Sequence, residues 1–276
     1  MLVRINLFAM VAAVGISIAT CVNLASAQQT PALAATVSES APIPAAQIPQ
    51  NINDAVASPG RPAADRALDV GRRPDQMLAF FGIAPGMKVG EIFAGGGYTT
   101  QLLSAAVGPT GMVYSQNPVF PPERQRIADA FSARLKNPEL KNVSAISTKP
   151  DSDDLFGAPA GSLDVVVTNM NYHDLVLVGA DRGKINGAVF KALKPGGVYG
   201  IVDHSAKPGT GASDVKLHRI DEDFVIAEVE KSGFKLAAAS SALRHPEDDR
   251  TWVTAPQAAG ARRGTSDRFM IKFVKP

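Results

Sequence analysis

The chain has 276 residues, of which 45% are hydrophobic and 20% are charged, and its net charge is +2. This composition is ordinary for a folded globular protein. The lysines and arginines are spread along the sequence rather than clustered, and nucleic-acid binding requires a clustered basic surface. We therefore expect a globular protein that does not bind nucleic acid.

The N-terminal segment has the layout of a secretory signal peptide. Arg4 precedes a long apolar stretch, and residues 25–27 (ASA) form an A-x-A cleavage pattern. We expect cleavage after Ala27, export to a bacterial periplasm, and no stable membrane span after cleavage. Two alternatives stay open. The apolar stretch remains as a membrane anchor, or Cys21 is the modified cysteine of a lipoprotein, although the threonine before it is large for such a site.

Cysteine content and composition define the organisation of the rest of the chain. Cys21 is the only cysteine of the sequence, so the cleaved form would contain no disulfide and no cysteine-based metal site. Residues 28–60 are rich in Ala, Pro, Gln, Ser and Thr and have few large apolar side chains, which indicates a flexible linker. We expect a single folded domain over residues 61–276, stabilised by an ordinary apolar core.

Strands and helices alternate along this domain. The sequence predicts helices over 63–70 and 74–81, a strand over 87–94, a helix over 98–107 and a strand over 112–116. Next come a helix over 123–135, strands over 143–147 and 163–168, a helix over 181–193 and a strand over 198–202. Apolar, β-branched strands between helices indicate a parallel sheet that is covered on both faces.

The C-terminal part departs from this alternation. A helix over 221–232 is followed by strands over 234–241 and 268–274, with a polar loop between them that has no helix-length apolar pattern. We therefore expect these last two strands to be antiparallel neighbours. The charges of this loop are interpreted first as solvated and second as a lid over a substrate. Likewise Arg66, Asp69, Arg72 and Asp75 either form a solvated face or cap a ligand pocket.

Three consecutive glycines follow the first expected parallel strand, in the stretch EIFAGGGYTT at 91–100. Glycine lets the backbone approach a ligand without a Cβ atom in the way, and the next helix points its free N–H groups at the same place. Ligands of open α/β sheets bind beyond the carboxyl ends of the strands. The stretch favours a nucleotide-type cradle, with a purely structural turn as the alternative. It is not a P-loop, because no Gly-Lys-Ser/Thr follows.

Three stretches in order resemble the class I S-adenosylmethionine-dependent methyltransferases. They are VGEIFAGGGYTTQLLSAAVGPTGMVYSQ at 89–116, LDVVVTNMNYHD at 163–174 and ALKPGGVYGIVDH at 192–204, and the last is the most specific. The resemblance covers about residues 74–276, and the C-terminal part looks like a branch of exported methyltransferase-like proteins. It implies an α/β fold with a doubly wound, mostly parallel sheet of seven strands and an antiparallel last strand. It also implies S-adenosylmethionine as the cofactor.

The resemblance further implies which residues hold the cofactor. Glu91 matches the acidic residue of the first strand, which orients the methionine end, and Asn169 lies beside the sulfonium. Gln116 and Asn117 fall where the family usually has an acid that binds the ribose hydroxyls, and Phe93 stands where it usually has its first glycine. The glycine loop would contribute Ala94, Gly95, Gly96 and Gly97.

Two of the four histidines follow neighbouring strands of the expected sheet. His173 comes after the fourth strand and His204 after the fifth, so both side chains should lie at the ligand end of the sheet. A neutral imidazole there could remove a substrate proton, with Asp174 or Asp203 to orient it. In the alternative, each imidazole only hydrogen-bonds backbone at a strand end. Tyr172 either lines the substrate cavity or packs in the core.

A metal site is the less favoured use of these histidines. His218 could join His173, His204 and a carboxylate, but the spacing matches no short metal motif, so we expect no metal ion. The sequence favours an exported S-adenosylmethionine-dependent methyltransferase that acts on a small molecule. A non-catalytic binding protein that retained the fold, and a metal-assisted enzyme that uses His173 and His204, are the alternatives.

Overall fold

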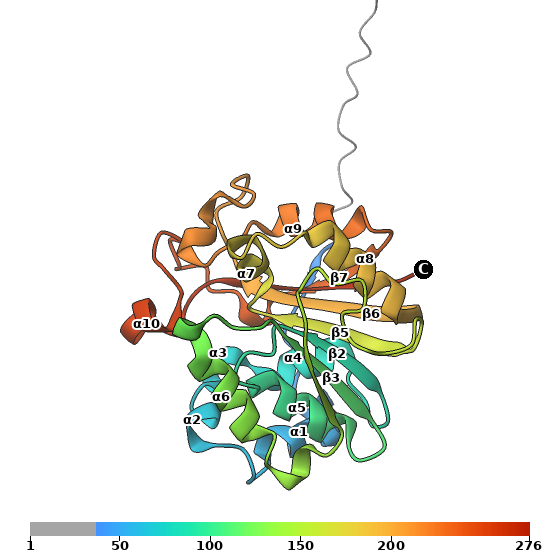
Figure 1. Ribbon diagram of the computed structural model, residues 1–276. Helices are drawn as coiled ribbons and strands as arrows, with labels where there is room; N and C mark the ends of the chain where they lie inside the picture. The colour runs from blue at the N-terminus through green and yellow to red at the C-terminus, as the bar shows by residue number, and fades with distance from the viewer. Residues whose placement is uncertain (1–36) are drawn as a thin grey trace, which may run out of the picture. The chain divides into compact units, whose positions relative to one another are not determined.

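An eight-stranded sheet runs through residues 37–276, which are the residues that the computed structural model describes (Figure 1). The expected signal peptide and residues 28–36 of the expected linker lie outside them. The strand order is β1-β7-β8-β6-β5-β2-β3-β4. The strands are β1 (Glu39–Ser40), β2 (Lys88–Ile92), β3 (Met112–Asn117), β4 (Val143–Ser147), β5 (Leu163–Asn169), β6 (Leu193–His204), β7 (Lys235–Ser240) and β8 (Arg268–Val274).

The directions of the strands confirm most of the sequence prediction. Strands β2 to β6 pair in parallel, whereas β8 is antiparallel to both of its neighbours, β6 and β7. The expected number of seven strands was wrong. The additional strand, β1, pairs in parallel with β7 through only two residues, Glu39 and Ser40. A strand of two residues has no apolar alternation, so no sequence pattern could reveal it.

Helices cover both faces of the sheet (Figure 1). One core cluster includes side chains of α1, α4 and α5, and the other includes side chains of α7, α8 and α9. Three short helices, α1, α7 and α10, were not expected from the sequence. The helices are α1 (Gln50–Ala57), α2 (Ala63–Arg66), α3 (Asp69–Arg72), α4 (Pro74–Phe81), α5 (Tyr98–Val107), α6 (Gln125–Arg134), α7 (Tyr172–Leu177), α8 (Arg182–Ala192), α9 (Glu222–Glu230) and α10 (Pro256–Ala259).

The helix boundaries near the sheet edge follow local rules. As predicted, α4 begins at Pro74 and ends before Gly82, whose φ of +74° a residue with a Cβ atom rarely adopts. Helix α5 begins directly after Gly97, which has a φ of +85°. A Cβ atom at Gly97 would lie 2.8 Å from Cδ of Arg134 on α6. Gly97 is therefore required both by the turn and by the packing of α6 against it.

Part of the segment that the sequence indicated as a flexible linker is folded onto the domain. Helix α1 buries Ile52 in the cluster that also contains α4 and α5, and Ile48 before it is buried as well. The Nδ2 group of Asn51 donates a hydrogen bond to the carbonyl oxygen of Ala106 on α5. Ile48, Ile52 and Val56 are spaced four residues apart, so a sparse apolar stripe suffices to dock a short helix that otherwise has only small or polar residues.

The order of the strands reverses between β2 and β5. From β2 the chain continues outward to β3 and β4, and then returns to β5 and β6 on the other side of β2. Ligands of open α/β sheets bind beyond the carboxyl ends of the strands at such a reversal. The residues that follow β2, β5 and β6 therefore define where a site is expected. Within residues 37–276, no helix combines the length and the apolar character needed to cross a membrane.

We predict that Ile52→Ala lowers the free energy of unfolding by about 2–4 kcal/mol, because it leaves a cavity between α1 and the rest of the core. Urea denaturation measures this change. Val119→Ala is the control, since Val119 is 79% exposed and its truncation should change stability by less than about 0.5 kcal/mol. Equal stability of the two variants would show that α1 is not part of the folded core.

Candidate functional site

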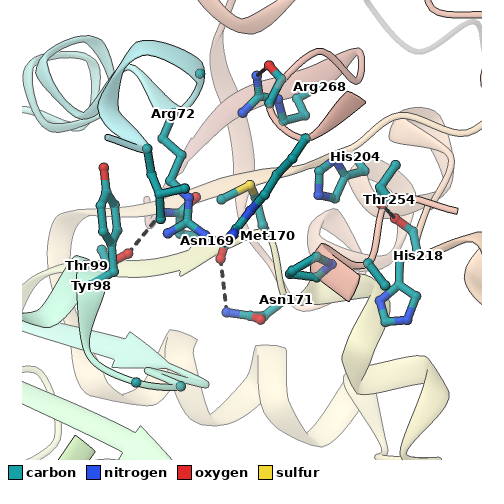
Figure 2. A pocket seen from close by; sticks show the side chains of 18 of the residues that line it. Arg72, Tyr98, Thr99, Asn169, Met170, Asn171, His204, His218, Thr254 and Arg268 are labelled. Carbon is teal, nitrogen blue, oxygen red and sulfur yellow. Dashed lines mark hydrogen bonds between the residues drawn. The ribbon is translucent and has the colours of Figure 1, made fainter. Parts of the chain in front are cut away.

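A cavity of about 700 Å³ opens at the carboxyl ends of β2 and β5 (Figure 2). Its wall includes the loop after β2, the loop after β5, the end of β6 and helix α3. Parts of the polar loop at 252–266 complete it, and of the charges in this loop only Arg263 is in the wall. Side chains that are far apart in the sequence thus meet at the reversal of the strand order.

Glu91, the last residue but one of β2, lines this cavity and is almost fully buried. Its Oε2 atom accepts hydrogen bonds from the Oγ1 group of Thr100 at 2.6 Å and the Oγ group of Ser115 at 2.8 Å. Burial raises the pKa of this carboxyl to about 7, against the opposing effect of the two hydroxyls. A cationic group of a ligand would favour the charged form, so Glu91 is suited to bind one.

The loop after β2 is held in place by the two residues that end β3. The Oδ1 atom of Asn117 accepts from the Gly95 N–H at 2.8 Å, and its Nδ2 group donates to the Gly95 carbonyl at 3.0 Å. Gln116 accepts from the Phe93 N–H at 3.3 Å and donates to the Thr148 carbonyl at 2.8 Å. Both side chains are buried outside the cavity wall. They brace the loop, whereas the resemblance implied contacts with a ribose.

The glycine loop leaves space that a ligand can fill. Ala94, Gly95 and Gly96 line the cavity, whereas Gly97 does not. A Cβ atom at Gly95 would have the Phe93 carbonyl, 4.0 Å away, as its only protein neighbour within that distance. Phe93 itself also lines the cavity without filling it. The bare backbone at the carboxyl end of β2 therefore fits a cofactor cradle.

Three cavity residues other than glycine have a left-handed backbone. The φ angles are +55° at Phe93, +58° at Met170 and +54° at His218. Such residues cost about 1–3 kcal/mol each and cluster at ligand sites. Hydrogen bonds hold two of them: Asn171 Nδ2 donates to the Phe93 carbonyl at 2.9 Å, and the Met170 N–H donates to the Val202 carbonyl at 2.6 Å. No sequence pattern indicates this strain.

His173 lies on α7 beside the buried carboxylate of Asp203 at the end of β6. Asp203 accepts from the His173 backbone N–H at 2.8 Å, pairs with its Nδ1 atom at 2.6 Å and accepts from the His204 N–H at 2.7 Å. Burial by itself would lower the pKa of His173, but the Asp203 carboxylate outweighs burial and raises that pKa above its usual value. Of the two acids that the sequence proposed, Asp203 therefore orients Nδ1, whereas Asp174 lies 3.6 Å from Nε2.

His204 lines the same cavity, and its pKa is shifted in the opposite direction to that of His173. Its Nδ1 atom pairs with the Oγ group of Ser266 at 2.7 Å, and its ring centroid lies 6.0 Å from that of His173. Burial first, and then the neighbouring cations, lower the pKa of His204 well below its usual value. The imidazole of His204 is therefore neutral near pH 7.

Of the two remaining expected site residues, Asn169 is in the cavity wall and Tyr172 is not. Asn169 lines the cavity, and its Nδ2 group donates to the Oγ1 atom of Thr99 at 3.0 Å. Tyr172 is fully buried in the core under α7 and does not line the cavity. Its hydroxyl donates to Glu228 at 3.2 Å and accepts from Asn186 at 3.0 Å. Of the two interpretations of Tyr172, packing is therefore the one observed.

Two arginines line the cavity. Arg72 is one of the charges that the sequence interpreted either as a solvated face or as a cap over a ligand pocket, whereas Arg268 did not stand out in the sequence. Arg72 reaches in from α3, with its guanidinium carbon 4.3 Å from the ring centroid of Tyr98, and Arg268 begins β8 (Figure 2). Burial lowers the pKa of both, that of Arg268 to about 10. Within residues 37–276, no carboxylate forms an ion pair with either guanidinium. Arg72 is available to bind an anionic group of a ligand, whereas the Nε and Nη2 groups of Arg268 already donate to the carbonyl oxygens of Ser266 and Gly264.

Comparisons with known proteins define the class of fold. No protein-family model and no curated protein matches the sequence. The structure is similar to a SAM-dependent methyltransferase from Aquifex aeolicus, with a TM-score of 0.55 and 18% identity over 77% of this chain and 95% of that one. It is also similar to an arsenic(III) S-adenosylmethionine methyltransferase from Chlamydomonas reinhardtii, with a TM-score of 0.53 and 16% identity over 82% and 73%.

A third similar structure contains a cofactor product. Geranyl diphosphate C-methyltransferase from Streptomyces coelicolor A3(2) has a TM-score of 0.52 and 11% identity, over 81% of this chain and 87% of that one. It was solved with Mg²⁺, geranyl diphosphate and S-adenosyl-L-homocysteine. Residues 37–276 therefore have the fold of the class I S-adenosylmethionine-dependent methyltransferases, which is the fold that the sequence resemblance implied. At these identities, the likeness defines the fold.

We predict that the free energy of unfolding depends on pH through Glu91. The pKa of Glu91 is raised from 4.5 to about 7 in the folded state, so the folded protein binds this proton more tightly than the unfolded chain does. Stability should therefore fall as pH rises from about 4.5 through 7. Glu91→Gln cannot ionise and should lack this component.

Urea denaturation of both proteins between pH 5 and pH 8 measures the effect. The free energy of unfolding of Glu91→Gln, minus that of the wild type, should increase by about 2–3 kcal/mol across this interval. Using the difference removes any constant effect of the amide group. Parallel pH profiles for the two proteins would contradict a raised pKa at Glu91.

Proposed function

We propose that this protein is an S-adenosylmethionine-dependent methyltransferase that acts on a small-molecule acceptor after export from the cytoplasm. The observation that carries the proposal is the cavity at the strand reversal, which Glu91, the bare backbone of Gly95 and Asn169 line together. Its volume of about 700 Å³ is within the range of small-ligand pockets, about 300–1,000 Å³. Two similar structures are named after small compounds: one is an arsenic(III) methyltransferase, and the other is a geranyl diphosphate C-methyltransferase. The proposal of export depends on residues 1–27 alone.

The charges of the cavity suit the methionine end of the cofactor. Glu91 is the partner for its ammonium group, and Arg72, which has no acidic partner within residues 37–276, is the partner for its carboxylate. Gly95 and Gly96 leave room for the adenosine part against bare backbone. When bound, the cofactor supplies an electrophilic methyl group. The residues of the chain hold the two reactants in line, and this proximity supplies most of the rate.

His204 is the candidate for the residue that accepts the proton of the acceptor. Its imidazole is neutral, it lines the cavity, and only its Nδ1 atom is hydrogen-bonded to a side chain of residues 37–276. The sequence favoured His173 for this role. Both ring nitrogens of His173 are already engaged, Nδ1 with Asp203 and Nε2 with His218 at 3.0 Å. His173 is therefore less available to take a proton from a substrate.

Calorimetric titration of the protein with S-adenosylmethionine and S-adenosylhomocysteine tests the proposal. We predict a Kd below about 1 mM for the wild type, and affinity at least about tenfold weaker in Gly95→Leu, whose side chain would occupy the cradle. Gly82→Leu is the matched control. Gly82 has a left-handed φ of +74°, has no protein atom within 4 Å of an added Cβ atom and lies outside the cavity.

Both leucine variants carry a similar backbone cost of about 1–2 kcal/mol. A difference between their affinities for the cofactor would therefore come from the side chain at Gly95 occupying the cradle. A wild-type protein that binds neither compound near millimolar concentration would contradict the methyltransferase proposal. Equal affinities of the two variants would instead show that the glycine loop is structural. Cofactor binding without methyl transfer to any acceptor would favour a non-catalytic binding protein.

A second titration tests the assignment of Arg72. We predict that Arg72→Met weakens binding of S-adenosylhomocysteine by about 10–100-fold, because a charge-assisted hydrogen bond contributes about 1.5–3 kcal/mol. Binding of 5′-methylthioadenosine, which has no carboxylate, should be unchanged. The control is Arg73→Met, since the Arg73 side chain is 41% exposed and lies 3.5 Å from Asp75. Equal losses for both ligands would contradict a contact with the carboxylate.

A further inference from the structure

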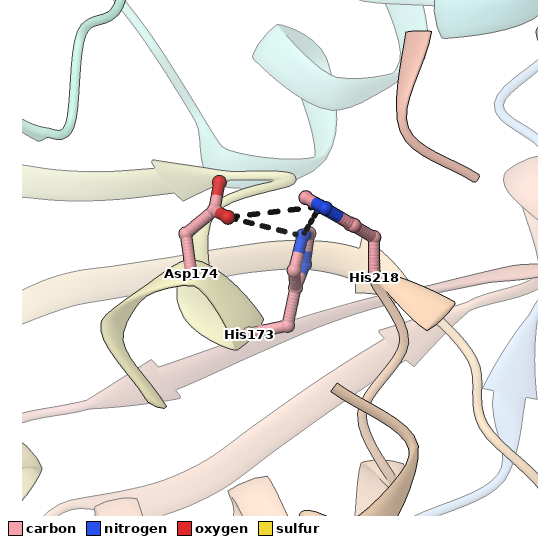
Figure 3. A group of neighbouring side chains, drawn as sticks. All are labelled: His173, Asp174 and His218. Atoms are coloured by element: carbon pink, nitrogen blue, oxygen red, sulfur yellow. Dashed lines mark hydrogen bonds and ion pairs between the residues drawn. The ribbon is translucent and has the colours of Figure 1, made fainter. Parts of the chain in front are cut away.

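Three side chains with metal-binding atoms converge on one side of the cavity (Figure 3). The Nε2 atom of His173 lies 3.0 Å from the Nδ1 atom of His218. The Oδ1 atom of Asp174 lies 3.6 Å from each of these two nitrogens. His173 and Asp174 lie in the first turn of α7, whereas His218 follows the short 3-10 helix Ser213–Leu217. No short sequence motif therefore joins the three residues.

The distances fit ligands that share one ion better than they fit hydrogen bonds alone. Ligands about 2.05 Å from an ion at the corners of a tetrahedron are about 3.3 Å from one another. The observed distances, 3.0 and 3.6 Å, lie on either side of this value. A hydrogen bond explains the two imidazoles, but it does not explain a carboxylate oxygen that is equidistant from both nitrogens and beyond hydrogen-bond range.

The surroundings hold the two imidazoles in position. Asp203 pairs with Nδ1 of His173 at 2.6 Å, and its own position is fixed by the backbone N–H groups of His173 and His204. A carboxylate on the far nitrogen is the usual outer partner of a metal-bound histidine, since it fixes the tautomer and the ring orientation. His218 has a left-handed φ of +54°, and its carbonyl accepts from the Oγ1 group of Thr254 at 2.7 Å. Strain and hydrogen bonding together direct this ring at His173.

We propose that His173, Asp174 and His218 bind one divalent transition-metal ion, with Asp203 as the outer partner of His173. Two imidazoles and one carboxylate suit ions such as Zn²⁺, Co²⁺ and Mn²⁺. The sequence predicted no metal ion, and the alternative metal site that it left open included His204. The Nδ1 atom of His204 instead pairs with Ser266, so His204 is outside the group.

Three protein ligands leave at least one coordination position open. Because all three residues line the cavity, the open position faces the space available to a small molecule. An oxygen atom of the methyl acceptor fits this position, since a bound divalent ion favours the deprotonated form of a coordinated hydroxyl. This assignment of the acceptor class rests on the proposed methyl transfer. The proposed metal site does not depend on methyl transfer.

Titration of the metal-free full chain, purified without a histidine tag, with Zn²⁺, Co²⁺ and Mn²⁺ tests the site. Isothermal calorimetry gives stoichiometry and affinity, and the visible absorption of Co²⁺ reports coordination by the protein. We expect one equivalent of metal per chain. His218→Ala and Asp174→Asn should each weaken binding more than about tenfold, since loss of an outer partner alone costs about 10–100-fold.

His245→Ala is the matched control, because it removes a histidine that lies outside the cavity wall and should leave metal binding unchanged. Thermal melting of each variant establishes that it is folded. The proposal is overturned if the wild type binds none of the three ions, or if His218→Ala binds metal as tightly as His245→Ala. The titration contains no cofactor, so its outcome is independent of whether the protein transfers methyl groups.

Discussion

The parallel pairing of β2 with β5, and of β5 with β6, is the constraint on which the cavity depends. Ile92 pairs with Thr168 and Asn169 pairs with Val202, so the chain leaves these three strands at nearly the same level. The loops must then turn away within one or two residues. Phe93 and Met170 do so with left-handed backbones, whose cost is offset by hydrogen bonds between the loops and to β6.

The charged groups around this cavity divide it into two ends. At one end, Glu91 is buried and Arg72 is half-buried, both without ion-pair partners among residues 37–276, which is costly unless a ligand supplies the opposite charges. At the other end, His173, Asp174 and His218 face one another across short distances. The first end suits a zwitterionic group, and the second suits a cation. A cofactor and a metal-bound acceptor would therefore occupy different ends.

Local patterns in the sequence were sufficient for most of the framework. The ends of α4 and α5 follow from Pro74, Gly82 and Gly97, because these residues restrict or permit backbone angles regardless of tertiary contacts. The order of the motifs also led to the observed fold class and to Glu91, Gly95, Asn169 and His204 as cavity residues. The pattern missed α1, α7 and α10, since such short helices gain their stability from docking.

The sequence by itself thus determined the alternation of strands and helices, the glycine loop and the set of histidines and acids available at the strand ends. Only the tertiary structure decided how these groups are used. It turned Gln116 and Asn117 toward the loop backbone, placed Tyr172 in the core and brought His218 to His173 from 45 residues away. The physical reason is that propensity and spacing act over a few residues, whereas the direction of a side chain depends on the neighbours that the folded sheet supplies.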